Sequence, residues 1–336
     1  MWLVNRMKFL TKLFIFIDIV AAICYFLVYG PIKDIRVFWI TTSMETMNHK
    51  YLAHVFYSDK AIEETLKENY FEAVGEDTDP SQVTIGVTEN NTNYESVYEQ
   101  QILEHNPDDV FKLIEFKYKG FNCYLIAVYD PKRVHAAAIS NLNKGKILTE
   151  ISKENGALAA INGGGYSWTT YMPKGFILTD GNFRYSQNST KKYPTAIFNE
   201  DGVLIVGSFS KKQVIEKGAV HALSFGPVLI TNGKPIKIVG TGGSGMNPRT
   251  VLAQRKDGIV LFLVVNGYGQ SMSFKGRGGV YLNDLLVILE RYGAYNAINM
   301  DGGSSTTMVI DNKLVNSPCE PQKNGQDFIK SAWIIK

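Results

Sequence analysis

The sequence predicts an α+β protein: a mixed, largely antiparallel sheet domain with hairpins and a few flanking helices, preceded by an N-terminal transmembrane helix. Three observations predict this: 30 Gly with 18 Tyr and 18 Phe, three Asx-Gly hairpin signals, and a long apolar run near the N-terminus. The 336 residues suffice for one large or two ordinary domains, and 45% apolar residues exclude a disordered chain. A net charge of +3 gives no reason to expect a nucleic-acid partner.

The first element is the apolar run Leu13–Tyr29, which is interrupted only by Asp18. Its length is at the short end of the roughly 17–25 residues that a transmembrane helix needs. Asp18 would cost about 2.5–3.5 kcal/mol at mid-bilayer, but it is near the cytoplasmic end of the run. Arg6, Lys8 and Lys12 precede the run and favour an N-terminus on the inside.

A cleaved signal peptide and a buried core helix are the alternatives for this run. No A-x-A-like cleavage site follows it, and Gly30-Pro31 simply end it. We therefore expect residues 1–30 to be a cytoplasmic tip and an uncleaved, single-pass signal anchor in the cell membrane. The C-terminal domain would then be extracytoplasmic.

Residues 31–109 are expected to form a stem and an acidic linker. The stem is predicted to be helical, since Ala61–Asn69 is rich in helix formers and Ser58 or Asp59 can cap the helix. Gly75–Asp109 carries nine Asp/Glu and no Lys or Arg, which is typical of a solvated linker.

Residues 110–336 have the pattern of a compact sheet domain, which we expect to be catalytic. Lys112–Lys119 alternates in part, and Phe121–Tyr129 predicts a more buried strand. Asx-Gly turns predict three hairpins, namely 195–199 with 203–206, 227–230 with 235–239, and 250–254 with 259–265.

One late helix is predicted over Val280–Tyr292. Its leucines at 282, 285, 286 and 289 follow the i, i+3, i+4, i+7 spacing, and Gly293 is a natural stop. Three hairpins with few helices favour an α+β fold over a doubly wound one.

Several familiar motifs are excluded. Gly240–Gly245 matches G-x-G-x-x-G, but it leads into a predicted strand rather than a helix. There is no P-loop, G-x-S-x-G, H-E-x-x-H or C-x-x-C. The five His are scattered, so we expect neither a metal site nor a cofactor. Cys123 and Cys319 could pair, but two cysteines do not establish a disulfide.

Four predicted strand ends place polar groups beside glycine or proline: Asn162, Arg249, Asn266 and Asp301. A single strand end of this kind is more often a turn than a site, but four in one domain favour a site. Arg offers a planar fork that matches phosphate, and Asp301 could act as base, acid or nucleophile. The loop Gly302–Ser305 could supply an anion nest.

The order of the segments INGGGY, GPVLITNG, NPRT, VVNGYGQ, NMDGGSSTTMV and LVNSP resembles the phosphodiester glycosidase family over residues 110–336. The resemblance implies hydrolysis of a sugar 1-phosphodiester, typically α-linked N-acetylglucosamine 1-phosphate. Bacterial members are often associated with exopolysaccharide or cell-envelope material. A glycan that contains a sugar phosphate is therefore the expected partner.

By position, the resemblance carries the family's site onto Asn162, Gly163, Arg249, Asp301, Gly302, Gly303 and Ser304. The chain departs from the family pattern in three places. Asn266-Gly-Tyr replaces the usual Asp-Gly-Arg, Ser304 replaces the third glycine of the usual Asp-Gly-Gly-Gly-Ser, and Glu320–Lys323 stands where an arginine is common.

We hypothesise that the phosphate binds Arg249 and the N–H groups of Gly302–Ser304, and that Asp301 activates water or stabilises an oxocarbenium-like centre. Asn162 and Asn266 would hold the sugar. His221 is a candidate proton donor, although a lone His is more often structural. Four aromatic residues could stack on a sugar, namely Tyr166, Trp168, Tyr171 and Tyr268.

The alternative function is a non-catalytic, membrane-anchored carbohydrate-binding or scaffold module of polysaccharide assembly. A metal-dependent phosphodiesterase is disfavoured, because the acidic and His residues do not cluster in the sequence. The sequence does not specify the natural substrate or whether the chemistry is retaining or inverting. It also leaves the oligomeric state open, and a homo-oligomer is one of the possibilities.

Overall fold

The computed structural model describes residues 2–30, 32–45, 50–73, 75–86, 93–167, 169–268, 278–319 and 323–336. Trp168, the end of the VVNGYGQ motif and Glu320–Gln322 lie outside these residues, as does the centre of the acidic segment. The chain divides into two compact units. The first is Met1–Tyr70 with Val239–Gly245, and the second is Phe71–Ile238 with Met246–Lys336.

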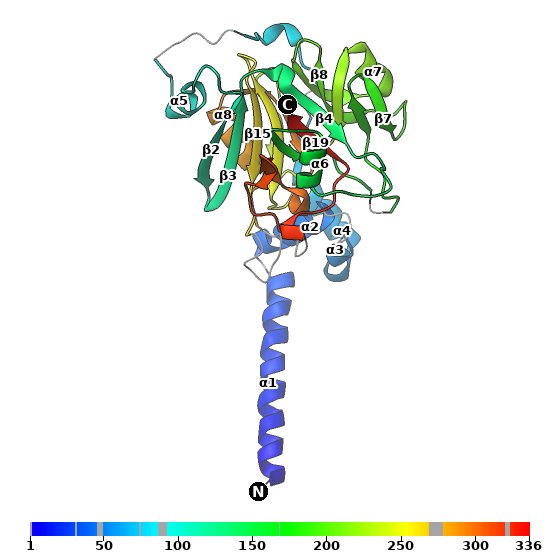
Figure 1. Ribbon diagram of the computed structural model, residues 1–336. Coiled ribbons are helices and arrows are strands. Elements are labelled where there is room, and N and C mark those ends of the chain that lie inside the picture. Colours follow the sequence, from blue (N-terminus) through cyan, green and yellow to red (C-terminus); the bar gives the residue numbers. More distant parts are fainter. Residues whose placement is uncertain are drawn as a thin grey trace. The chain divides into compact units, whose positions relative to one another are not determined.

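The first unit is helical, as the stem prediction expected (Figure 1). Ser58 caps its last helix by accepting a hydrogen bond from the Ala61 amide at 3.3 Å. A small core of Ile40, Ala53 and Ile62 holds the short helices together. The helices are α1 (Trp2–Tyr29), α2 (Lys33–Glu45), α3 (Tyr51–Phe56) and α4 (Asp59–Lys67).

Helix α1 contains a stretch from Arg6 to Phe26 that is long and apolar enough to cross a membrane, with a mean hydropathy of 2.1. None of that stretch is buried within the chain. The described side chains therefore do not support a buried core helix, whereas a signal sequence and a membrane anchor both fit.

The segment 75–109, which we expected to be a solvated linker, instead contributes buried side chains to the second unit. The Thr78 hydroxyl donates to Asn296 Oδ1 at 3.2 Å and accepts from the Val206 amide at 2.9 Å. Ile102 is fully buried in the core. The sequence prediction failed here because a few buried residues do not change the acidic composition of the whole segment. The segment contains η1 (Pro80–Gln82) and α5 (Val97–Leu103), and β1 (Tyr70–Glu72) precedes it.

The second unit is built on a seven-stranded antiparallel sheet in the order β12-β11-β16-β14-β15-β3-β2. Leu261, Leu263 and Val265 point to the core that includes α8. Val260, Phe262 and Val264 alternate with them and point to a second core. This double burial explains the continuous apolar run. The strands are β2 (Phe111–Tyr118), β3 (Phe121–Val128), β11 (Val228–Thr231), β12 (Lys234–Pro235), β14 (Arg249–Arg255), β15 (Val260–Val265) and β16 (Ala294–Met300).

Two five-stranded antiparallel sheets complete this unit, in the orders β7-β6-β10-β8-β9 and β18-β17-β5-β19-β4. Their inner faces contribute to the second core, where Trp333 and Phe198 pack edge to face. Their strands are β4 (Val134–Ala138), β5 (Ala159–Asn162), β6 (Phe176–Thr179), β7 (Asn182–Ser186), β8 (Tyr193–Asn199), β9 (Leu204–Phe209), β10 (Ala219–Ser224), β17 (Met308–Ile310), β18 (Lys313–Leu314) and β19 (Ser331–Ile335). The short strands β1 and β13 (Lys237–Val239) form a further two-stranded sheet.

The predicted hairpins 195–199 with 203–206 and 250–254 with 259–265 are confirmed as β8–β9 and β14–β15. The third forms as β11–β12, but its returning strand ends at Pro235, and Lys237–Val239 is the separate strand β13. The late helix is confirmed as α8 (Leu282–Arg291), and Gly293 has a φ of 70° just beyond it, a value that favours glycine. The remaining helices are α6 (Leu148–Glu154), α7 (Lys211–Glu216) and the 3-10 turns η2 (Pro131–Arg133), η4 (Gly303–Ser305) and η5 (Lys323–Gly325). The α+β prediction is therefore correct.

Candidate active site

The four polar strand ends predicted from the sequence occur at strand ends in the structure. Asn162 is the last residue of β5, and Arg249 is the first residue of β14. Asn266 follows β15, and Asp301 follows β16. Strand β14 pairs with both β15 and β16, so its first residue lies level with the ends of both neighbours. The topology therefore gathers Arg249, Asn266 and Asp301 at one edge of the seven-stranded sheet.

The Asn162 side chain joins this edge to the neighbouring sheet. Its Nδ2 donates to the Asp301 carbonyl at 2.6 Å, and its Oδ1 accepts from Thr250 Oγ1 at 2.7 Å and from the Thr307 amide at 3.1 Å. The side chain is fully buried. We expected Asn162 to contact a sugar, but its position is that of a brace that fixes the backbone of Asp301.

The glycines after Asn162 permit close packing around Asp301. The Asp301 amide donates to the Gly163 carbonyl at 3.1 Å. A Cβ atom on Gly165 would lie only 3.2 Å from Asp301 Cγ and 2.7 Å from the ring of Phe225. Glycine is therefore required here because protein atoms, rather than a ligand, approach the backbone.

The Asp301 carboxyl group is partly buried, and its Oδ1 accepts from the Gly302 amide at 3.1 Å. Burial raises the pKa of Asp301 to about 6. The Ser305 hydroxyl and the charge of Lys174 lower this pKa, whereas the charge of Asp327 raises it. A carboxyl group with a pKa near 6 can take up or release a proton near neutral pH.

Asp327 is a second carboxylate at this site, and the sequence analysis missed it. Its Oδ2 accepts from Ser304 Oγ at 2.9 Å and from Ser305 Oγ at 3.3 Å. The signal is weak, because the Asn-Gly-Gln-Asp segment around it matches no motif. The pairing of β19 with β5, which sets Ala332 opposite Asn162, helps to bring this part of the chain to the site.

Lys174 is the second residue that the sequence did not single out. Its side chain is exposed, and its charge acts on Asp301. Its amide donates to the Gly165 carbonyl at 3.0 Å, which fixes it beside the glycine run. A strand-end pattern could not reveal it, since Lys174 lies in the loop before β6.

The loop after Asp301 does not form the anion nest that we expected from its amides. The Gly302 amide donates to Asp301 itself, and the Gly303 amide donates to the Pro248 carbonyl at 2.9 Å. A Cβ on Gly302 would lie 2.7 Å from the same carbonyl oxygen. Two of the three expected phosphate donors are therefore used inside the protein.

Arg249 and Asn266 are both nearly buried. Arg249 Nε donates to the Val280 carbonyl at 3.3 Å. Asn266 Oδ1 accepts from Asn316 Nδ2 at 3.0 Å, and that amide group also donates to the Thr306 carbonyl. Asn316, from the LVNSP motif, is thus a second brace. A shallow hollow beside these groups is lined by Pro248, Asn266, Gly267, Gly303, Thr306, Asn316, Ser317, Pro318 and Cys319.

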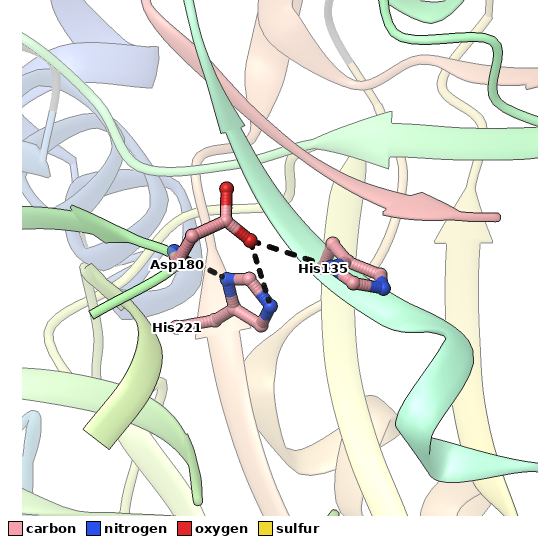
Figure 2. Close-up of side chains that lie close together, drawn as sticks. All are labelled: His135, Asp180 and His221. Carbon is pink, nitrogen blue, oxygen red and sulfur yellow. Dashed lines mark hydrogen bonds and ion pairs between the residues drawn. The ribbon is translucent and has the colours of Figure 1, made fainter. Parts of the chain in front are cut away.

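His221 has different neighbours from those we expected of a proton donor to the site. It lies on β10, with Nε2 3.9 Å from Asp180 Oδ1 and its ring 4.6 Å from that of His135 (Figure 2). Burial lowers the pKa of His221 to about 4, so the ring is neutral at neutral pH. The expectation that the histidines do not cluster was wrong, because antiparallel pairing brings together residues far apart in sequence.

The remaining sequence hypotheses divide between buried and exposed groups. Tyr166 is buried under Lys330, whose Nζ lies 4.9 Å from the ring centroid, so this ring does not face solvent. Tyr171 and Tyr268 are exposed. Cys123 and Cys319 are both buried, and no disulfide joins them in the part of the chain that the structure describes.

These observations first define a class: an α+β protein with three large antiparallel sheets and a partly buried carboxyl group at a glycine-flanked strand end. A family model described as phosphodiester glycosidase matches residues 155–336, which is more than half of the chain. The chain therefore belongs to the phosphodiester glycosidase family.

The chain is also similar to individual curated proteins. The chain is 26% identical over 186 residues to the SPbeta prophage-derived uncharacterized protein YomE of Bacillus subtilis, covering 52% of this chain and 27% of that protein. It is 24% identical over 182 residues to the mouse N-acetylglucosamine-1-phosphodiester alpha-N-acetylglucosaminidase, covering 49% and 34%. The chain thus spans about a third or less of the length of these relatives.

A solved structure shares the fold. The catalytic domain of the zebrafish N-acetylglucosamine-1-phosphodiester alpha-N-acetylglucosaminidase, auto-inhibited by its pro-peptide, superimposes with a TM-score of 0.56 at 21% identity. The match covers 69% of this chain and 85% of that one.

Proposed function

We propose that this protein is a hydrolase that cleaves a sugar 1-phosphodiester, of the α-N-acetylglucosamine 1-phosphate type. The observation that carries the proposal is the Asp301 carboxyl group, which has a pKa of about 6 and is fixed by Asn162 at the edge of the sheet. Family membership supports the reaction class. The named activity of the mouse and zebrafish relatives supports the substrate type.

In this proposal Asp301 is the group that acts at the anomeric carbon. It is mostly ionised at pH 7, and it then either activates water or stabilises positive charge on the sugar ring. Asp327 is the second carboxylate of the pair, oriented by Ser304 and Ser305. Most glycosidases use two carboxyl groups, whose different environments give them different protonation states.

In this proposal, positively charged side chains recognise the phosphate. Lys174 is exposed and acts electrostatically on Asp301, so it can contact the departing phosphomonoester. Arg249 is nearly buried at the start of β14, beside the end of β16 that leads into Asp301, and its positive charge adds to the potential there. Strong acid assistance is unnecessary, since a phosphomonoester is a stable leaving group.

The proposed location is the outer face of a cell membrane, with α1 as the anchor. The exposed apolar stretch Arg6–Phe26 and the preceding basic residues support this orientation. A substrate held in cell-envelope or exopolysaccharide material would be within reach of such an anchored enzyme.

A non-catalytic carbohydrate-binding module is the second candidate, and one observation favours it. Position 266 carries a neutral amide bonded to Asn316, where the family commonly has a carboxylate. A domain with this change could retain sugar affinity without turnover.

The test uses the full chain in a mild detergent and a synthetic α-N-acetylglucosamine 1-phosphodiester. We expect the wild type to release N-acetylglucosamine and Asp301→Asn to bind the substrate without releasing it. Asp311→Asn is the matched control, because Asp311 is an exposed turn residue with φ 48° that Asn tolerates equally well. Binding without release by the wild type would support the module instead.

A further inference from the structure

Three potential metal ligands meet where two of the sheets pack together. His135 comes from β4, His221 from β10, and Asp180 from the turn between β6 and β7 (Figure 2). Asp180 Oδ1 lies 3.9 Å from His135 Nδ1 and 3.9 Å from His221 Nε2. One donor atom from each residue lies within 4.8 Å of the other two.

The three side chains point toward one another but form no side-chain hydrogen bonds with one another. A separation of 3.9 Å is too long for a hydrogen bond. His135 Nδ1 is buried and has no hydrogen-bond partner among the described residues. A buried nitrogen without a partner is costly, and a bound cation would remove that cost.

We propose that His135, Asp180 and His221 form a binding site for a divalent transition metal ion of the zinc type. Two imidazoles and one carboxylate are ligands that such ions prefer, whereas Mg²⁺ and Ca²⁺ prefer all-oxygen sites. Solvent can supply further ligands, since the Asp180 side chain is 72% exposed. The site lies outside the Asp301 machinery and is independent of the proposed function.

The geometry requires a small closure. With bonds of about 2.1 Å, neighbouring ligands of one ion lie roughly 3.0–3.4 Å apart, so each carboxylate–imidazole distance must shorten by about 0.5–0.9 Å. Asp180 can supply this movement, because it is an exposed turn residue with φ 48°. Its amide now donates to His221 Nδ1 at 3.3 Å. Ligation through Nε2 places the ring proton on Nδ1 and gives up this long bond.

The local charges also bear on the site. Burial lowers the pKa of both histidines, so they are present in the neutral form that binds metals. The nearby charge of Lys336 contributes to the lowering and opposes a bound cation. The Asp180 carboxylate is the group that offsets it.

A metal ion here would connect two sheets. Strand β4 lies at the edge of the β18-β17-β5-β19-β4 sheet, whereas β6 and β10 belong to the β7-β6-β10-β8-β9 sheet. The expected consequence is higher stability of the second unit, because an ion that binds only the folded state shifts the unfolding equilibrium.

The experiment titrates the full chain in detergent, without a polyhistidine tag, with Zn²⁺ alone and measures binding by calorimetry. We expect one Zn²⁺ per chain. We also expect a rise in melting temperature of about 5 °C when free Zn²⁺ is 100-fold above Kd.

Asp180→Asn is the decisive variant, since Asn keeps the turn conformation while removing the charged ligand. Zinc affinity should fall at least tenfold with the metal-free melting temperature unchanged. His221→Gln should abolish the site. His54→Gln is the matched control, because His54 pairs with Asp59 at 2.9 Å on the surface and belongs to no metal-ligand cluster among the described residues. No zinc binding by the wild type, or equal affinity in Asp180→Asn, would overturn the proposal.

Discussion

The Asp301 loop and the histidine cluster both contain titratable side chains withdrawn from water, and burial acts on them in opposite directions. It raises the pKa of Asp301 to about 6 and lowers that of His221 to about 4. In each case burial disfavours the charged form, which is the anion of a carboxyl group and the cation of an imidazole.

The two regions differ in how their polar atoms are satisfied. Around Asp301, the Asn162 amide makes three hydrogen bonds, and both Ser304 and Ser305 contact Asp327. In the cluster, His135 Nδ1 has no hydrogen-bond partner among the residues that the structure describes. Hydrogen bonds of this kind fix the Asp301 loop in one geometry. In contrast, a histidine cluster with an unpaired buried nitrogen can bind a further partner such as a metal ion.

The largest expected effect is on turnover at Asp301. Asp301→Asn should lower kcat about 10³-fold with KM little changed, because the carboxylate acts in the transition state. Steady-state release of N-acetylglucosamine measures this, with Asp311→Asn as the unaffected reference. A decrease in kcat of less than tenfold would show that another group performs the chemistry, and Asp327 would then be the first candidate.

The next effect concerns the brace. Asn162→Ala leaves the Asp301 carbonyl, Thr250 Oγ1 and the Thr307 amide without this partner, which should cost about 3 kcal/mol. The melting temperature of the second unit should fall by about 5–10 °C. Asn122→Ala, at an exposed position of β3, is the control and should change it by no more than a degree or two. Equal effects of the two changes would show that the brace is not required.

The raised pKa of Asp301 predicts opposite pH dependences for activity and stability. Turnover should rise as the pH passes through about 6, because the ionised form is the active one. Stability should fall as the pH rises from about 4 to about 6, because the folded state binds the proton more tightly than the unfolded chain, for which the pKa is 3.8.

Asp301→Asn removes this penalty. Allowing for partial exposure, the variant should be about 2 kcal/mol more stable than wild type at pH 7 and equal to it near pH 4. Thermal unfolding at the two pH values measures the difference. A variant that is less stable at pH 7 would contradict the assignment of a raised pKa.

The smallest effect is expected at Lys174. Lys174→Ala should raise KM about tenfold with little change in kcat, because a single exposed contact to phosphate is lost. It should also move the pH profile of turnover upward, since the lysine charge lowers the pKa of Asp301. Lys313→Ala, an exposed lysine on β18, is the matched control. An unchanged KM would remove Lys174 from the site.

Local patterns predicted much of the fold and part of the site. The hairpins were predictable because Asn232-Gly233 and Asp257-Gly258 demand particular turns, and α8 was predictable from its leucine spacing. Asp301 was predictable because it ends an apolar strand before two glycines. Each of these signals lies within a few neighbouring residues.

The rest depends on which strands become neighbours. Asp327 reaches the site through the pairing of β19 with β5, and His135 meets His221 because their sheets pack together. Neither contact produces a recognisable pattern of residue spacing in the sequence. The same holds for the buried side chains of the acidic segment, where Thr78 bonds to Asn296, 218 positions away.

The structural role of Asn162 changes how the family's motifs should be interpreted. A gene copy that lost its catalytic activity would still need Asn162 and Thr250 to fold, so selection for solubility alone would preserve the Asn-Gly-Gly signature. That signature therefore reports descent and foldability. Evidence of retained chemistry must come from side chains that do not hold the sheets together, and in this chain these are the Asp301 carboxyl group, which lowers stability at neutral pH, and Lys174.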